Sequence, residues 1–166
     1  MMLNVPNKVK LAYLIKKLRI DINAIKEDTD DGMDKRIKLQ KIVYFAKLLG
    51  VDFDYNYSMY LHGPYSPELA KDYYSLSQVN VDEATVCEAI DKIYLRIEEL
   101  YRKDTIWLET AASVINVRKS NPDLDWNYIV DHVYNIKSDI LAMNNKDSKY
   151  VENVFQDLKT LKFTYN

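Results

Sequence analysis

The chain has little of what makes tight turns, cross-links or membrane spans. Its 166 residues include three glycines, four prolines and a single cysteine, Cys87. So few glycines and prolines favour long elements joined by few tight turns. One cysteine excludes an internal disulfide framework and fits a reducing compartment. No apolar run is long enough to cross a bilayer, so the sequence predicts a soluble, globular protein.

The first residues also lack a targeting pattern. MMLNVPNKVK contains neither the apolar core nor the small-residue cleavage site of a signal peptide. Together with the single cysteine, this predicts a cytoplasmic protein. The length is typical of one domain, so we expect residues 1–166 to form a single helical domain.

Apolar periodicity predicts helices along most of the chain. Residues 7–20 carry one apolar stripe, and residues 35–50 are apolar on two sides, as in a central helix, which Gly50 would end. The polar residues 26–34 read as a loop, with Asp31 or Asp34 capping the helix that follows. Asp82 would start a helix with an apolar seam from Val86 to Leu100. Asp104 would cap the next helix, and two shorter helices follow around residues 126–133 and 151–158.

Residues 53–62 switch to a period of two, which predicts a half-buried strand. The inward set would be Phe53, Tyr55, Tyr57, Met59 and Leu61. A lone strand is unstable, so it should form a hairpin within the segment or pair elsewhere, for example with residues 162–166; the sequence does not choose between these. The expected fold is therefore mainly α, a compact bundle of about six or seven helices with a small β element around residues 53–62.

Catalytic and cofactor motifs are scarce. His62, His132 and Cys87 are not at metal-ligand spacings, and three scattered glycines cannot build a phosphate-binding loop. His62 and Ser66 place an imidazole four residues from a hydroxyl, which does not by itself make a catalytic pair. We therefore expect no catalytic residue, no metal site and no cofactor, and predict that the protein is not an enzyme.

The segment YLHGPYSPELAKDYY, residues 60–74, fits a structural junction better than an active-site loop. Gly63 and Pro64 would turn the chain out of the strand, and Tyr65 would anchor it. Ser66 followed by Pro67 is the pattern of a helix N-cap and first helical residue. The tyrosines of this segment exceed what one junction needs for packing, and large amphipathic rings favour partner recognition.

A second set of residues raises the alternative of nucleic-acid binding. Residues 1–50 carry eleven Lys and Arg against six Asp and Glu, so this part of the chain could face an anionic partner. Tyrosines nearby could stack on bases. The basic residues nevertheless surround both N-terminal helices, where one stripe would be expected, and the pI of about 5.7 is low for a dedicated binder.

Two stretches resemble a known family. RIKLQKIVYFAKLLG (36–50) and YNYSMYLHGPYSPELAKDY (55–73) resemble the YwgA-like group of uncharacterised prokaryotic proteins and, more distantly, the Panacea superfamily of SocA-like antitoxins. LETAASVINVRKSNPDLDWNYIV (108–130) is similar to the later half of the YwgA-like proteins, so the resemblance spans about residues 30–140. Positions that match the motif are Leu39, Gln40, Lys41, Tyr44, Phe45, Gly63 and Pro64.

The resemblance implies a mainly helical fold with a small β element. For the Panacea relatives it implies binding to a partner protein, either to neutralise a toxin or to present it for degradation. The YSPEL continuation fits the YwgA-like group better than the typical antitoxins.

We accordingly predict a non-enzymatic protein-interaction module, antitoxin-like or a proteolysis adaptor, whose partner is another protein such as a toxin or a protease substrate. A nucleic-acid-binding regulator that uses the basic N-terminal helices is the alternative. The partner, the oligomeric state and the biological process stay open. The candidate interaction residues are Leu39, Gln40, Lys41, Tyr44, Phe45, Tyr60, His62, Gly63, Pro64, Tyr65, Ser66, Pro67 and Leu69.

Overall fold

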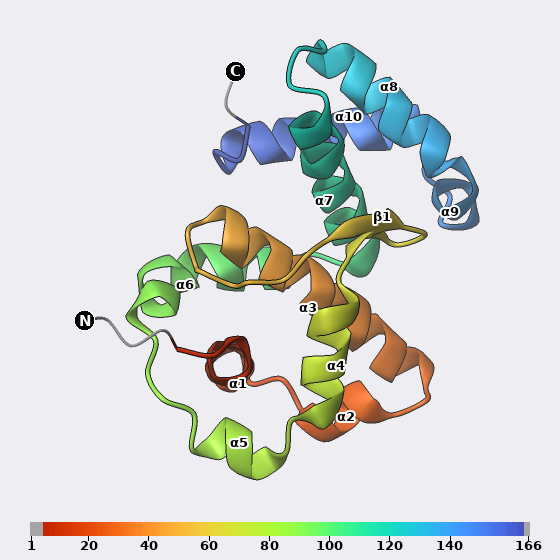
Figure 1. Ribbon diagram of the computed structural model, residues 1–166. Helices are drawn as coiled ribbons and strands as arrows, with labels where there is room; N and C mark the ends of the chain where they lie inside the picture. The colour runs from red at the N-terminus through yellow and green to blue at the C-terminus, as the bar shows by residue number, and fades with distance from the viewer. Residues whose placement is uncertain (1–4, 165–166) are drawn as a thin grey trace. The chain divides into compact units, whose positions relative to one another are not determined.

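The computed structural model describes residues 5–164 and is mainly helical (Figure 1). Within these residues, ten helices accompany one two-stranded sheet, β1 (Ser58–Tyr60) with β2 (Gly63–Tyr65). This confirms the predicted mainly α fold with a small hairpin. None of the helices in residues 5–164 is both long and apolar enough to span a membrane.

The described residues group into two units, which we treat separately. The first unit contains residues 5–58 and 65–103, and the second contains residues 59–64 and 104–164. The prediction of a single domain stays a prediction. The hairpin is divided between the two units: residues 59–64 fall in the second unit, and Ser58 and Tyr65 fall in the first.

The first unit is built around one long helix. Its helices are α1 (Asn7–Leu18), α2 (Ile22–Lys26), α3 (Asp30–Leu48), α4 (Pro67–Ser75), α5 (Gln78–Asp82) and α6 (Glu88–Tyr101). α3 contacts α2, α4 and α6, which confirms its predicted central position. α1, seen end-on in Figure 1, contacts α4, α5 and α6. Gly50, at φ 107°, follows the end of α3 as predicted, because this backbone region favours glycine.

The predicted loop over residues 26–34 is wrong in its second half. α3 already begins at Asp30, and Thr29 is the N-cap, with its hydroxyl accepting a hydrogen bond from the Gly32 amide at 3.0 Å. Gly32 lies in the first turn of α3, and a glycine is needed there because α2 passes close by. A Cβ at this position would stand 2.3 Å from the carbonyl oxygen of Glu27 and 2.8 Å from that of Ala24. A close helix approach, and not a turn, explains this glycine.

Two further boundaries differ from the prediction. Asp82 ends the short helix α5 and does not start the next one; α6 begins at Glu88 after the N-cap Cys87. Val86 therefore lies outside the helix and is 63% exposed. The short helices α2, α5 and α9 (Ser138–Met143) were not predicted, because five or six residues are too few to show a helical period.

The second unit is a smaller helical group. α7 (Thr105–Ser120), α8 (Trp126–Ile136) and α10 (Ser148–Thr160) contact one another, and α9 contacts α8 (Figure 1). Asp104 caps α7 as predicted, since its carboxylate accepts a hydrogen bond from the Trp107 amide at 2.9 Å. The expected inner face of α7 is buried: Leu108, Ala111, Ala112 and Ile115.

The strand prediction holds in part. Phe53 and Tyr55 are buried and their neighbours are exposed, but residues 51–57 form no ladder, and β1 starts only at Ser58. Met59 and Leu61, predicted to point inward, are exposed. Of the two pairing options, the structure shows a local hairpin, because the chain turns back at residues 61–62. Residues 162–164 form no strand, and residues 165–166 lie outside the described part.

Candidate functional site

The turn of the hairpin presents apolar side chains. Met59, Tyr60 and Leu61 follow one another along the chain and are 36, 53 and 71% exposed. We call these three residues the hairpin tip. Gly63 closes the turn at φ 90°, a conformation that favours glycine. Three consecutive large apolar residues facing solvent are unusual in a chain with a well-filled core, so the tip is a candidate contact surface.

Two buried ionisable side chains of the second unit hold this turn. The Lys137 ammonium, at the junction of α8 and α9, donates a hydrogen bond to the Leu61 carbonyl oxygen at 3.1 Å. The Glu109 carboxylate, on α7, is 2.8 Å from Nδ1 of His62. Lys137 and Glu109 are each 3% exposed. We call His62, Glu109 and Lys137 the polar anchor.

The electrostatics of the polar anchor follow from its burial. Burial lowers the pKa of Lys137, and the negative charge of Glu109 opposes that effect. When Glu109 is ionised, the Nδ1–H group of His62 donates a hydrogen bond to the Glu109 carboxylate. Ser113, one turn after Glu109, donates a hydrogen bond to the Glu109 main-chain oxygen at 2.7 Å and lies 4.0 Å from the Met59 sulfur. Lys137 and Glu109 thus contact the turn at Leu61 and His62, and Ser113 contacts Met59.

Chemically, the polar anchor orients one imidazole and one ammonium. A histidine held through Nδ1 by a carboxylate leaves Nε2 as its second polar atom. Ser66, considered above as a hydroxyl partner for His62, is fully buried, and its Oγ accepts a hydrogen bond from the Leu69 amide at 3.3 Å. Ser66 is the N-cap of α4, with Pro67 as the first helical residue, as predicted.

Gln40, from the family-like motif, is a buried structural link within the first unit. Its Nε2 donates to the Ser66 carbonyl oxygen and its Oε1 accepts from the Ser66 amide, both at 2.9 Å. The side chain is 1% exposed. A side-chain amide that satisfies both main-chain groups of one residue fixes the start of α4 against α3.

The other motif residues are mostly buried as well. Leu39, Lys41 and Phe45 are fully buried on α3, and Tyr44 is nearly so. Gly63, Pro64 and Leu69 are also buried, and Tyr65 is half-buried. Among the candidate interaction residues, solvent reaches mainly Tyr60, His62, Tyr65 and Pro67. The motif therefore describes how the fold is built more than how it meets a partner.

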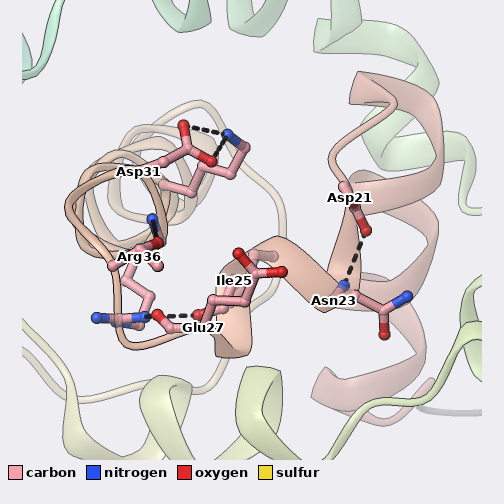
Figure 2. Close-up of polar contacts among 9 residues, drawn as sticks. Asp21, Asn23, Ile25, Glu27, Asp31 and Arg36 are labelled. Carbon is pink, nitrogen blue, oxygen red and sulfur yellow. Dashed lines mark hydrogen bonds and ion pairs between the residues drawn. The ribbon is translucent and has the colours of Figure 1, made fainter.

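Most basic side chains of the N-terminal helices bind within the fold. Figure 2 shows the junction of α2 and α3, where Arg36 donates to the carbonyl oxygens of Ile25 and Glu27, both at 2.7 Å. Lys35 pairs with Asp31 at 2.6 Å. Several lysine ammonium groups donate to carbonyl oxygens elsewhere in the first unit: Lys10 to Asp52, Lys16 to Asp82, Lys26 to Leu76, Lys38 to Tyr101 and Lys47 to Tyr55. Three of these carbonyls, of Leu76, Asp82 and Tyr101, lie at helix ends, which glycine caps often serve in other proteins.

Sequence reasoning missed Glu109 and Lys137. Both lie in segments read as ordinary amphipathic helix, and neither belongs to a motif with a known chemistry. Around the helix, Glu109 lies about 100° from Leu108, outside the predicted inner face of α7, so the local pattern did not indicate its burial.

Metal ligation and known relatives add nothing to this site. Within residues 5–164, no group of three or more His, Cys, Asp or Glu side chains converges to hold an ion. The chain matched no protein family, no curated protein and no solved structure with which it was compared.

Proposed function

We propose that the protein is a protein-interaction module and that the hairpin tip is its contact surface. The observation that carries the proposal is the contrast at residues 59–62. Three apolar side chains face solvent on a turn whose main chain and histidine are held by buried ionisable groups. The tip contains tyrosine and methionine and no charged residue, a composition enriched at the centre of protein interfaces.

The free-energy penalty of burying the charged groups of the polar anchor supports this proposal. Burying a charged side chain carries a penalty of several kcal/mol, and an ion pair repays it only with good geometry. A turn that merely joined two strands would not need Lys137 and Glu109 beneath it. A turn that must keep one shape before a partner arrives benefits from them, because a preorganised loop loses less entropy on binding.

The partner class is another protein, with a toxin or a protease substrate as the first to test. The family resemblance supports this choice. An antitoxin role and an adaptor role differ in outcome: an antitoxin restores growth to cells that express the toxin, whereas an adaptor lowers the steady-state amount of its partner. Measuring both in the same co-expression strain separates them.

The test is co-purification from the native cell with matched variants. Leu61→Asp places a charge at the centre of the tip, and Leu95→Asp does the same on the exposed face of α6, where the side chain is 79% exposed. Both sites are open to solvent, so both variants should fold. We expect the unaltered chain and Leu95→Asp to retain the same partner in comparable amounts, and Leu61→Asp to lose it. Equal retention by the two variants would contradict the proposal.

Nucleic-acid binding stays the alternative, and the geometry favours it less. Most cations of the N-terminal helices already bind carbonyls or carboxylates of the fold, and Lys41 is fully buried. Counterion release needs cations that are free to meet phosphates. Indifference of single-stranded DNA binding to Lys38→Glu would remove the alternative.

A further inference from the structure

A cleft of about 580 Å³ opens in the first unit, where α1 and α6 end. Its volume lies in the range of small-molecule sites. Six side chains that matter for its chemistry line it: Lys17, Arg19, Tyr94, Glu98, Tyr101 and Arg102. Three cations face one carboxylate, so the lining carries a formal charge of +2 (three minus one).

The cations differ in how far the fold already uses them. The Lys17 ammonium is 2.8 Å from an Asp91 carboxylate oxygen and 4.5 Å from the centre of the Tyr94 ring. Arg102 pairs with Glu98 one turn earlier, at 2.8 Å, but its side chain is 74% exposed. Arg19 is exposed, and within residues 5–164 its guanidinium has no hydrogen bond or ion pair. The five donors of Arg19 are therefore available to a ligand.

The cations could simply balance the negative ends of α1 and α6, so the partial charge of these helix ends has to be compared with the charge of the cations. A helix C-terminus carries roughly half a negative charge, and two such ends would offset about one of the cations. Two carbonyls at these helix ends are already satisfied by other side chains, however. The Tyr94 hydroxyl donates to the Lys17 carbonyl oxygen at 2.8 Å, and Lys38 donates to the Tyr101 carbonyl oxygen at 2.7 Å. The guanidinium groups of Arg19 and Arg102 are in excess of what the helix ends require.

Arg19 has a second unusual property. It is the residue after α1, and its backbone is left-handed at φ 57°, where glycine is usual. A non-glycine residue in this conformation carries a conformational cost of order 1 kcal/mol. Tyr94 and Tyr101, both half-buried, add ring surface beside the cations, which suits a ligand with a planar group next to its charge.

We infer that this cleft binds a small phosphate ester of nucleotide size, with Arg19 and Arg102 on the phosphate groups and the two tyrosines beside the organic part. A guanidinium fork fits phosphate oxygens in pairs, and charge-assisted hydrogen bonds of this kind are stronger than neutral ones. The site is separate from the hairpin tip and does not depend on the proposed protein-interaction function.

Arg19→Gly is the sharpest variant, because it removes the guanidinium and places glycine where the backbone favours it. It should fold at least as well as the unaltered chain. Arg102→Gln removes the second exposed guanidinium without a change of helix preference. Lys71→Gln, on the exposed face of α4, removes one positive charge elsewhere in the same unit and is the control.

The experiment is isothermal titration calorimetry with ADP at low ionic strength. Adenosine is titrated in the same way as the uncharged probe. We expect ADP to bind and adenosine not to bind. Arg19→Gly and Arg102→Gln should each weaken ADP binding about tenfold, and Lys71→Gln should leave it within a factor of two, since tenfold corresponds to about 1.4 kcal/mol. Absence of ADP binding to the unaltered chain, or equal weakening by Lys71→Gln and Arg19→Gly, would overturn the inference.

Discussion

The two units of the molecule place their buried charge differently. In the first unit, buried or half-buried cations such as Lys10, Arg36 and Lys38 donate to main-chain carbonyl oxygens of other segments. In the second unit, a buried cation and a buried carboxylate lie beneath a single exposed turn. Among the described residues, the carboxylate side chain that is buried, Glu109, is in the second unit.

This difference separates charge that builds a fold from charge that supports a surface. A lysine that caps a helix end replaces a glycine or a water and stabilises the element it touches. The polar anchor holds the turn of a hairpin tip whose side chains are exposed. Buried ionic groups contribute little net stability compared with apolar ones, so we attribute the anchor to the position of the tip.

The largest expected effect tests the second unit. Glu109→Leu and Lys137→Met each remove one of two buried groups of opposite charge and should lower the free energy of unfolding by about 3–5 kcal/mol. The double variant should lose less than the sum of the two, because an apolar pair needs no charge partner. Urea denaturation measures all three. Glu152→Leu, on the exposed face of α10, is the control and should change stability by less than about 0.5 kcal/mol.

The next effect tests the polar links of the first unit. Gln40→Met keeps the side-chain length but leaves the Ser66 amide unpaired, while the Ser66 carbonyl oxygen keeps only its bond from the Ala70 amide, so the free energy of unfolding should fall by about 1–3 kcal/mol. Gln156→Met on α10, an exposed site, should be nearly neutral. A loss at Gln40 no larger than at Gln156 would show that this link does not hold α4 to α3.

Two tyrosines of the first unit, Tyr55 and Tyr57, test the value of a single buried hydrogen bond. The Tyr55 hydroxyl donates to Asp72 at 2.6 Å, whereas the buried Tyr57 hydroxyl has no hydrogen-bond partner within residues 5–164. Tyr55→Phe should lower the free energy of unfolding by about 1–2 kcal/mol. Tyr57→Phe should leave it unchanged or raise it slightly. Thermal or urea unfolding measures both, and equal losses would mean that the Tyr57 hydroxyl has a partner in solution.

The smallest expected effect is a pH dependence. Its hydrogen bond to Asp91 raises the pKa of Tyr13 to about 12, from about 10 in the unfolded chain. Because the folded pKa is raised, the contribution of Tyr13 to stability is complete below pH 10 and is lost between about pH 10 and 12. Tyr13→Phe should flatten part of that decline, measured as unfolding free energy against pH. An unchanged slope in Tyr13→Phe would contradict the assignment.

Local rules predicted much of the fold from the sequence. Ser66, Pro67, Asp104 and Gly50 stand at helix boundaries because each cap acts within a few residues. Rules of this range failed at Gly32, whose close approach to α2 is a tertiary fact. They also failed at Met59 and Leu61, since alternation continues in the sequence after the strand has left the core.

The candidate site was predictable only in part. The segment around Tyr60 and His62 stood out by composition, and the interpretation of Gly63 and Pro64 as a turn agrees with the structure. Glu109 and Lys137 are 47 and 76 residues away from their partners in the turn. Contacts at such separations depend on how helices pack, which no local pattern encodes.

Photo-crosslinking in the native cell tests the central claim most directly. A photoreactive residue at position 61 reports what touches the hairpin tip, and the same residue at position 95 reports nonspecific contacts of an equally exposed site. We predict a discrete protein adduct from position 61 that is absent from position 95 and that weakens when Lys137→Met releases the turn. No adduct from position 61, or the same adducts from both positions, would contradict the assignment of the hairpin tip as a contact surface.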